Sequence, residues 1–385
     1  MELKQVYEFT NLGVTQALGK SDILKEDLSN IVEVGDEVFN AKSVDKYVQT
    51  LVDHIGKVLF VDRTYRSHAP SVLIDGWEYG ATREKIHSPM PTAIINEAWE
   101  LQDGASYVGQ VFNKPVVTAK FYNQRDTFRV DTPSITRDQV KSAFSNASQM
   151  EQFISRLFNR TRNAITLRRD KLIMGTITSA VASTYHADIG AKDATKTSGV
   201  KAINLLKLYN DAKGTTLTKD KALYDTEFLK FASLQIALAS DHRETYSTLF
   251  NIGGTEKFTD KNRQHIVLLS NFKRGADVYL QSETFHNEFT KLPTSEGVNF
   301  WQGSGKNYNL ADVAKINCKD AEGDDVTIDC LIGCIFDRDR LGVCCQQSKI
   351  TSEYSATGDF YNYYNFFTAG YFNDLNENMV IFFLA

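Results

Sequence analysis

The sequence predicts an α+β fold with more than one domain. Three features predict it: a long helical pattern near the middle of the chain, helices that alternate with apolar strands after it, and aromatic-rich strands at the carboxyl end. The chain has 385 residues, of which 42 % are hydrophobic and 24 % are charged. That length is sufficient for two compact domains, each with its own core.

The first 130 residues combine helical patterns with a strand-rich excursion. A helical spacing recurs in Val44, Val48, Leu51, Val52 and Ile55. Residues 58–61 are expected to continue into a strand. Two further strand patterns follow at 72–79 and 116–122. The excursion over 71–130 and the stretch before it have little core of their own, so we expect both to need a neighbouring surface.

The strongest helix pattern lies in the middle of the chain. Residues 136–139 and 148–151 both have the form of a capping box. An apolar face then continues from Met150 to about Tyr185, which corresponds to roughly 50 Å of helix. Its basic residues, with few acids nearby, are Arg156, Arg160, Arg162, Arg168, Arg169 and Lys171. We interpret them as a solvated or neighbour-facing edge, with contact to nucleic acid as the alternative.

The second half of the chain predicts an α/β layer domain and then a meander. Helices are expected near 201–212, closed by Gly214, near 219–250, closed by Gly253-Gly254, and at 272–280. Strands are expected at 265–270 and 326–332. The meander covers 349–354, 360–371 and 379–384, with turns at 357–358 and 373–374. The carboxyl terminus is therefore expected to finish inside a sheet.

Charge and hydropathy exclude several classes of protein. The formal net charge is −5, whereas a protein that neutralises many phosphates usually carries a strong positive excess. No window approaches the roughly 20 apolar residues that cross a bilayer. The first residues also lack the apolar stretch of a signal peptide. We expect a protein that stays in the cytoplasm where it is made.

No recognised catalytic motif is present. Loops and signatures for phosphate, dinucleotide, zinc-protease or serine-hydrolase chemistry are missing. Asp337 and Asp339 are interpreted as ion-pair partners of Arg338 and Arg340, with a metal site as the weaker alternative. The Asp241-His242 pair has no nucleophile placed for it by sequence. We therefore expect no catalytic residue, no cofactor site and no metal site.

Three other sets of residues are assigned structural roles. The cysteines, interpreted as reduced core thiols because no CxxC pair occurs, are Cys318, Cys330, Cys334, Cys344 and Cys345. The aromatic run over 361–372 contains no Lys or Arg, which favours core or subunit contact over base stacking. Asp324-Asp325, after Gly323, predicts a turn.

Two stretches carry a resemblance to a known family. Residues 116–122 run through Asp131-Thr132-Pro133 into the capped helix, and residues 334–343 lead to 360–364. In this order of segments the chain resembles the major capsid proteins of tailed double-stranded DNA bacteriophages, which have the HK97-like capsid fold that encapsulins share. The resemblance covers most of the chain by architecture, and no short motif in it is diagnostic.

The resemblance implies a division into four parts. Residues 1–70 would be an N-terminal arm, and 71–130 an extended β-hairpin loop, the E-loop, lying over a neighbouring subunit. Residues 131–189 and 346–385 would form the peripheral (P) domain with its long spine helix. Residues 190–345 would form the α/β axial (A) domain, which packs around five- and six-fold axes.

The resemblance also implies a function and partners. Many copies would self-assemble, as pentamers and hexamers, into an icosahedral shell that encloses the double-stranded DNA genome, without enzymatic activity. Implied partners are a portal, DNA contacted non-specifically and a separate scaffolding protein, since the region before the excursion is too short for the internal scaffolding domain of some members. A decoration protein is a further possible partner, and no membrane is expected to be involved.

The expected location is the virion capsid, assembled in the host bacterial cytoplasm. The first alternative is an encapsulin-like nanocompartment shell protein, which has the same fold and a protein cargo. Another phage structural component and an unrecognised two-domain enzyme rank behind it.

Overall fold

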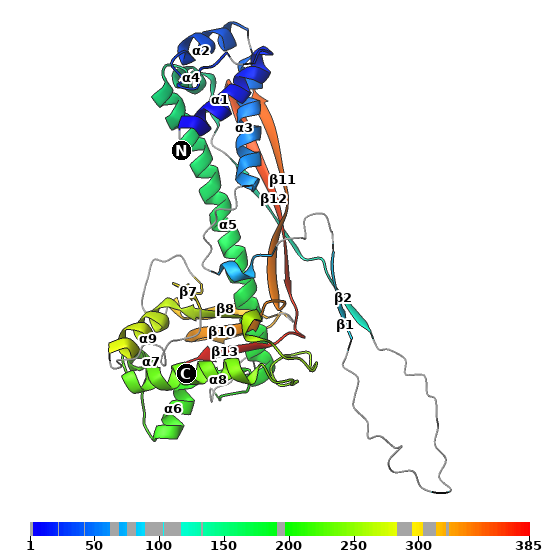
Figure 1. Ribbon diagram of the computed structural model, residues 1–385, viewed down its shortest axis with the longest axis vertical. Coiled ribbons are helices and arrows are strands. Elements are labelled where there is room, and N and C mark those ends of the chain that lie inside the picture. Colours follow the sequence, from blue (N-terminus) through cyan, green and yellow to red (C-terminus); the bar gives the residue numbers. More distant parts are fainter. Residues whose placement is uncertain are drawn as a thin grey trace. The chain divides into compact units, whose positions relative to one another are not determined.

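The computed structural model describes residues 3–21, 23–41, 43–61, 69–74, 82–88, 103, 117–131, 134–190, 197–282, 295–302, 313–320 and 323–385 (Figure 1). The chain divides into two compact units, each assembled from three separate stretches. Unit 1 comprises Met1–Glu78, Arg125–Ile177 and Val343–Gly370, and unit 2 comprises Tyr79–Gln124, Thr178–Gly342 and Tyr371–Ala385. Helices and strands occur in both units, so the expected α+β class is confirmed.

The helices of unit 1 share one hydrophobic core. They are α1 (Leu3–Leu18), α2 (Ile31–Asn40), α3 (Val44–Val61), α4 (Arg137–Ala143) and the first part of α5 (Ala147–Ile189). Val6, Val38 and Tyr47 from the first three helices are fully buried in the same cluster as Phe144 and Ile154. The neighbouring surface that the amino-terminal stretch is expected to need is thus supplied by the same chain. The strand expected at 58–61 is the last turn of α3.

The long central helix is confirmed, but one of its expected caps is not. Thr136 caps α4 as predicted, because its hydroxyl accepts from the Gln139 amide at 3.3 Å and the Gln139 side chain accepts from the Thr136 amide at 3.4 Å. The second expected box is wrong. Helix α5 begins at Ala147, and the Asn146 side chain accepts from the Gln149 amide at 2.8 Å, so Ser148 lies inside the helix. The helix is 43 residues long and supplies residues to both units.

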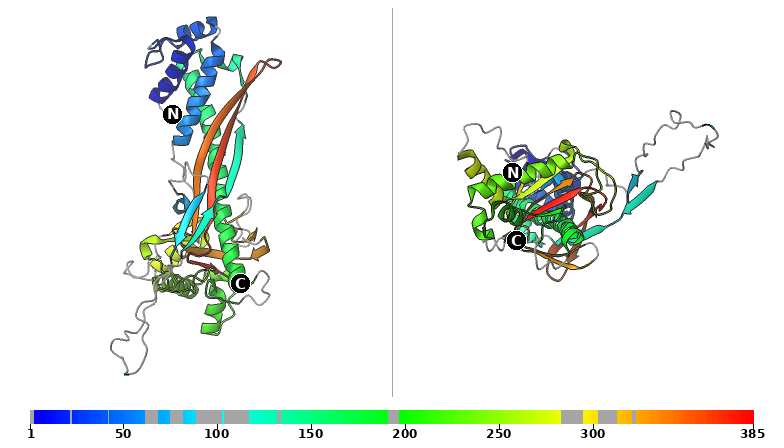
Figure 2. Two further views of the ribbon diagram at one scale, coloured as in Figure 1. Left: turned by 90° about the vertical axis from the view of Figure 1, so that its right-hand side faces the viewer. Right: turned by 90° about the horizontal axis from the view of Figure 1, so that it is seen from below.

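A mostly antiparallel sheet completes unit 1. Strands β11 (Leu341–Ser355), β12 (Phe360–Asn373) and β3 (Arg125–Asp131) lie in the order β11-β12-β3, and β4 (Ile135–Thr136) also pairs with β12. Figure 2 shows β11 and β12 running side by side over most of their length. Tyr361, Tyr363 and Phe367 of β12 are buried in the same core as the helices. For these three residues, the interpretation of the aromatic run as core is confirmed.

Unit 2 is built around a five-stranded mixed sheet. Its order is β5 (Ala202–Asn204), β13 (Met379–Phe383), β10 (Leu331–Asp337), β6 (Gln264–Leu269) and β7 (Glu296–Val298). The pairs β10–β13 and β10–β6 are antiparallel, whereas β13–β5 and β6–β7 are parallel. All residues of β10 and β13 are buried. Strands that are buried on both faces of a sheet have nearly continuous apolar sequences, and both of these strands show that pattern.

Four helices accompany this sheet. They are α6 (Leu205–Lys213), α7 (Lys219–Ala222), α8 (Thr226–His242) and α9 (Ser270–Ser282). In Figures 1 and 2, α8 runs along β13. Gly214 closes α6 as predicted, with the left-handed φ of 64° that glycine tolerates. The predicted helix at 219–250 is instead divided between α7 and α8, and α8 ends well before Gly253.

Three strand predictions are changed by the structure. The predicted strand at 326–332 is two strands, β9 (Asp325–Ile328), which pairs with β8 (Ile316–Lys319), and the start of β10. Pro70–Val72 is a short 3₁₀ helix, and the rest of the strand expected at 72–79 lies largely outside the described residues. The last strand, β13, pairs within the five-stranded sheet of unit 2 and not with β11 or β12.

Candidate functional site

A two-stranded hairpin in unit 2 has two chemically different faces. Strands β1 (Arg83–His87) and β2 (Thr118–Tyr122) pair antiparallel, with Lys85 opposite Lys120 and Ile86 opposite Ala119. Side chains alternate along a strand, and residues directly opposite each other share a face. One face therefore carries Arg83, Lys85, Lys120 and Tyr122, and the other carries Glu84, Ile86, Ala119 and Phe121.

Ion pairs anchor the cationic face of the hairpin. The ammonium of Lys85 lies 2.8 Å from the Asp374 carboxylate and 2.5 Å from that of Glu377. Both acids are buried, at 2 % and 5 % side-chain exposure. Lys120 approaches Asp374 at 3.7 Å, and Lys257 binds Glu377 at 2.9 Å. Burial weakens solvent screening, so the two pairs of Lys85 hold the hairpin more firmly than exposed pairs would.

A buried arginine and two aromatic rings reinforce this anchor. Arg340 is fully buried and donates to the backbone carbonyls of Asp374 at 2.6 Å and Glu377 at 3.2 Å. Burial lowers its pKa to about 10, with the charges of Asp374 and Glu377 acting in the opposite direction, so it stays cationic at neutral pH. The Arg83 guanidinium lies 4.4 Å from the centre of the Phe372 ring, which also contacts Tyr122.

The opposite face of the hairpin is mostly apolar, with Glu84 as its charged residue, and it is open to solvent. Ile86 is 65 % exposed and Phe121 is 64 % exposed. Val117, which directly precedes β2 and continues the alternation, is 56 % exposed. Large apolar side chains that gather on one exposed face mark a contact with another macromolecule. This face is therefore the candidate functional surface of unit 2.

The six basic residues of α5 have separate environments. Arg169 is buried. Arg168 binds both carboxylate oxygens of Asp126 at 2.9 Å, and Arg162 lies 6.0 Å from the centre of the Phe158 ring. Arg156, Arg160 and Lys171 are exposed, as Arg168 is, but they form no ion pair among the described residues. Fewer basic side chains of α5 are therefore available to a partner than the sequence predicts.

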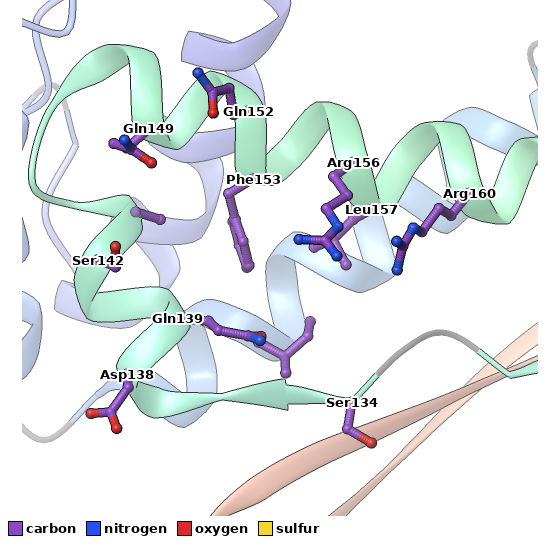
Figure 3. A pocket seen from close by; sticks show the side chains of 12 residues that line it. Ser134, Asp138, Gln139, Ser142, Gln149, Gln152, Phe153, Arg156, Leu157 and Arg160 are labelled. Carbon is purple, nitrogen blue, oxygen red and sulfur yellow. The ribbon is translucent and has the colours of Figure 1, made fainter.

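A pocket of about 420 Å³ opens in unit 1 where β4 and α4 meet the start of α5. Its apolar lining includes Ile135, Ala143 and Leu157, whose side chains belong to the core. Figure 3 shows Phe153 pointing from α5 into this space, with Arg156 and Arg160 following it along the helix. The pocket thus has an apolar floor and two cations at one side.

The acidic motifs noted in the sequence are surface or structural ion pairs. Asp337 and Asp339 both pair with Arg263, the first at 3.4 Å. Arg263 is remote in the sequence and replaces the expected neighbours, Arg338 and Arg340. Asp241 pairs with Lys261 at 2.9 Å, and both side chains are more than half exposed.

Four cysteines lie apart from one another as thiols. Cys330, Cys334 and Cys344 are buried, and Cys318 is partly buried. Burial raises the pKa of Cys330 and Cys334 to about 12 and that of Cys318 to about 11. Thiols of this kind stay protonated and unreactive at neutral pH. The structure therefore places these four as core thiols, and the side chain of Cys345 lies outside the described residues.

One group of metal-ligating side chains comes together in the described part of the chain. His186, Asp320 and Asp324 place their ligand atoms within 4.8 Å of one another. The His186 Nδ1 is hydrogen-bonded to Asp320, whose other oxygen accepts from the amides of Gly323 at 2.8 Å and Asp324 at 2.9 Å. The cluster offers three ligands, yet its buried carboxylate is already satisfied. Sequence reasoning missed it because His186 is 134 residues from Asp320.

Comparison with protein families identifies the chain. A model of the Phi29-like phage major capsid protein family matches residues 11–383. The chain belongs to this family. A sequence search of curated proteins finds no match. The capsid protein nevertheless resembles solved phage structures in its fold.

A similar fold occurs in the structure of the head fiber and inner core protein gp22 of native bacteriophage P68. Sequence identity is 10 %, the TM-score is 0.53, and the match covers 83 % of this chain and 85 % of that one. A chain from the capsid structure of Staphylococcus phage Andhra matches with 10 % identity, a TM-score of 0.48, and 82 % and 83 % coverage. The expected HK97-like capsid fold is confirmed.

Family membership decides the main function. This major capsid protein is a structural component of the phage virion, and it forms the shell by self-assembly. The encapsulin alternative receives no support. None of the helices in the described residues has the length and apolar character of a membrane span. The exposed apolar face of the β1–β2 hairpin therefore belongs to a protein whose partners include many copies of itself.

Proposed function

We propose that this capsid protein assembles as pentamers and hexamers into an icosahedral shell around double-stranded DNA, and that its extended loop, 71–130, lies over a neighbouring subunit. One observation carries the proposal: the β1–β2 hairpin is held by ion pairs on one face and exposes Ile86, Val117 and Phe121 on the other. The anchored face determines the hairpin's position, and the open face offers the contact.

The energetics favour a contact that is weak singly and strong collectively. Fully burying one large apolar side chain contributes about 1.5–3 kcal/mol. Three such side chains are too few for a stable dimer, since association also costs translational and rotational freedom. In a closed symmetric shell each subunit repeats the contact, so the assembly gains stability that a single pair lacks. This behaviour suits a protein that must stay unassembled until many copies meet.

The remaining segments receive their roles within the same proposal. Residues 131–189 and 346–385 act as the peripheral domain with α5 as its spine, and 190–345 act as the axial domain around the symmetry axes. The α5 helix and the β11-β12-β3 sheet support the first assignment. Strands β5, β6, β7 and β10 support the second, and β13, from the last residues of the chain, completes their sheet, so 371–385 belongs with the axial part. Residues 1–70 act as the arm, and their helices α1 to α3 pack in the core of the peripheral domain.

We also propose that scaffolding is supplied by a separate protein, together with a portal, and that assembly takes place in the host cytoplasm. Helices α1 to α3 belong to the core of unit 1, so they are not a detachable internal scaffold. A decoration protein is compatible with this scheme. The net charge of −5 supports non-specific, weak contact with the packaged DNA. The absence of enzymatic activity is part of the same proposal.

Substitution of the hairpin's apolar face tests the proposal. Phe121→Asp combined with Ile86→Asp should abolish closed shells when the chain is co-expressed with its gene neighbours. The purified subunit should retain its circular dichroism and melting temperature. The matched control, Phe121→Leu, keeps an apolar side chain and should assemble normally. Shells of normal yield and shape from the double-Asp variant, seen by negative-stain electron microscopy, would overturn the loop contact.

The scaffold proposal has a separate test. The purified capsid protein alone, concentrated at near-physiological salt, should give no uniform closed shells. Adding the scaffolding candidate from the neighbouring genes should give shells of one size. Uniform shells from the capsid protein alone would contradict a required separate scaffold, and would leave the loop contact unaffected.

A further inference from the structure

Helix α2 presents an acidic face on the outside of unit 1. Ile31, Val34, Gly35 and Val38 are buried in the core. The opposite side of the helix is exposed and carries three acids and one apolar side chain: Glu33, Asp36, Glu37 and Val32. Val32 is 50 % exposed.

The pocket of unit 1 presents the opposite charge. Arg156 and Arg160 are four residues apart on α5, so they lie on the same side of the helix. Both are exposed and line the pocket together with the partly buried ring of Phe153. At another part of the rim, Asp138 is an exposed acid. The pocket therefore favours an acidic partner beside the two arginines.

The three acids of α2 and the two arginines of the pocket form no ion pair within the described part of the chain. Other exposed charges of unit 1 have partners: Arg137 lies 3.3 Å from Asp45, and Arg168 lies 2.9 Å from Asp126. By contrast, no ion pair joins the α2 acids to Arg156 or Arg160. A Cβ at Gly35 would lie 2.7 Å from Phe144, so the buried side of α2 packs closely on the core and its acids point away from it.

We infer that the acidic face of α2 in one copy docks at the pocket of a second copy. In this contact Glu33, Asp36 and Glu37 face Arg156 and Arg160, and Val32 covers Phe153. The partner is another copy because the chain self-assembles and itself supplies the complementary charges. Two different surfaces meet head to tail, which is the kind of contact that closes into rings. The inference rests on self-assembly and is independent of the hairpin contact.

Complementary charge determines register and partner choice more than affinity in such a contact. Exposed ion pairs are individually weak and are screened by salt. The contact therefore orients subunits as they meet, and the repeated apolar contacts of the shell supply most of the binding. Assembly should consequently be sensitive to salt at this surface.

A charge-swap cycle tests the contact on the full chain co-expressed with its gene neighbours. One variant carries Arg156→Glu and Arg160→Glu, another carries Glu33→Lys and Glu37→Lys, and a third combines all four. Each two-site variant should lower the yield of closed shells about tenfold, and the combination should restore it to within about twofold, because a swapped pair regains its attraction. Lys171→Glu, a reversal on the same helix outside the pocket, should leave the yield unchanged.

Other outcomes overturn the inference. If Arg156 and Arg160 instead contact DNA, their reversal gives empty shells at normal yield, and the α2 variants have no effect. If they bind a different protein, the α2 reversal does not rescue them. Melting temperatures of the purified subunits within about 2 °C of each other exclude misfolding as the cause, since a change of 1 kcal/mol moves a chain of this size by about that amount.

Discussion

The ammonium of Lys85, at the centre of β1, lies 2.8 Å from the carboxylate of Asp374, which follows β12. The same ammonium reaches Glu377 at 2.5 Å. These contacts tie the root of the hairpin to the turn that precedes β13. The β1–β2 hairpin therefore has a fixed base on unit 2.

Lys85→Met should weaken this base. The substitution leaves two buried carboxylates with one partner fewer, and we expect the free energy of unfolding to fall by about 1.5–3 kcal/mol. Urea unfolding of the isolated subunit measures it. Lys120→Met is the control: its ammonium is 44 % exposed and 3.7 Å from Asp374, so its loss should cost less than about 1 kcal/mol. Equal effects of the two variants would contradict the anchoring role of Lys85.

The pairing of Asp374 predicts acid sensitivity. Burial by itself raises the pKa of Asp374, but the hydrogen bond and charge of Lys85 outweigh it and hold the pKa below the ordinary 3.8. A lowered pKa in the folded state contributes stability above pH 3.8 that is lost as the pH falls through the folded value. The stability difference between the native chain and Asp374→Asn should therefore be constant near neutrality and shrink below pH 3.8. A difference that shrinks between pH 7 and 5 would refute this origin.

The start of α5 gives a paired capping test. Asn146→Ala removes the acceptor of the Gln149 amide and should lower the free energy of unfolding by about 1 kcal/mol. Ser148→Ala, at the cap expected from the sequence, should change it by less than about 0.5 kcal/mol. Thermal or urea unfolding decides between the two positions. A larger loss of unfolding free energy from Ser148→Ala than from Asn146→Ala would support the capping box expected at 148–151.

Two helical glycines should respond to alanine in opposite directions. At Gly35 a new Cβ would lie 2.7–2.8 Å from Phe144, so Gly35→Ala should destabilise the chain by about 1–3 kcal/mol through overpacking. At Gly175, inside α5, a new Cβ meets nothing within 4 Å, so Gly175→Ala should stabilise it by about 0.5–1 kcal/mol. Melting temperatures of the two variants provide the measurement. A stabilised Gly35→Ala variant would mean that α2 does not pack on Phe144.

The buried cysteines should resist alkylation. Burial raises the pKa of Cys330 and Cys334 to about 12, so almost no thiolate is present at pH 8. Mass spectrometry after iodoacetamide treatment should find both unmodified in the folded subunit and modified in urea. Rapid modification of Cys334 under native conditions would show that the five-stranded sheet opens.

Local patterns predicted much of the fold. The Thr136 cap, the apolar face of α5, the Gly214 stop and strand β6 all depend on residues close together in the sequence. The pattern favours Ser148 over Asn146 as the cap of α5, although both residue types cap well, and only the backbone geometry distinguishes the two positions.

The candidate surfaces were less predictable. Strand β2 was expected, but its partner β1 was not, because Arg83 to His87 mixes charged and apolar residues without a strong pattern. Its apolar face becomes apparent only when Ile86 and Phe121 are brought to one side. The pocket beside Arg156 likewise requires α4 and α5 to be placed against each other.

The sequence by itself determined the α+β class, the long central helix and the lack of known catalytic motifs. Each of these depends on periodicity, composition or short motifs, which are local properties. Only the tertiary structure decided that Lys85 meets Asp374 and that Asp337 pairs with Arg263. It also decided that Arg168 pairs with Asp126, whereas Arg160 has no ion pair among the described residues. Such contacts join distant parts of the chain, and their energies depend on burial and distance, which no local pattern specifies.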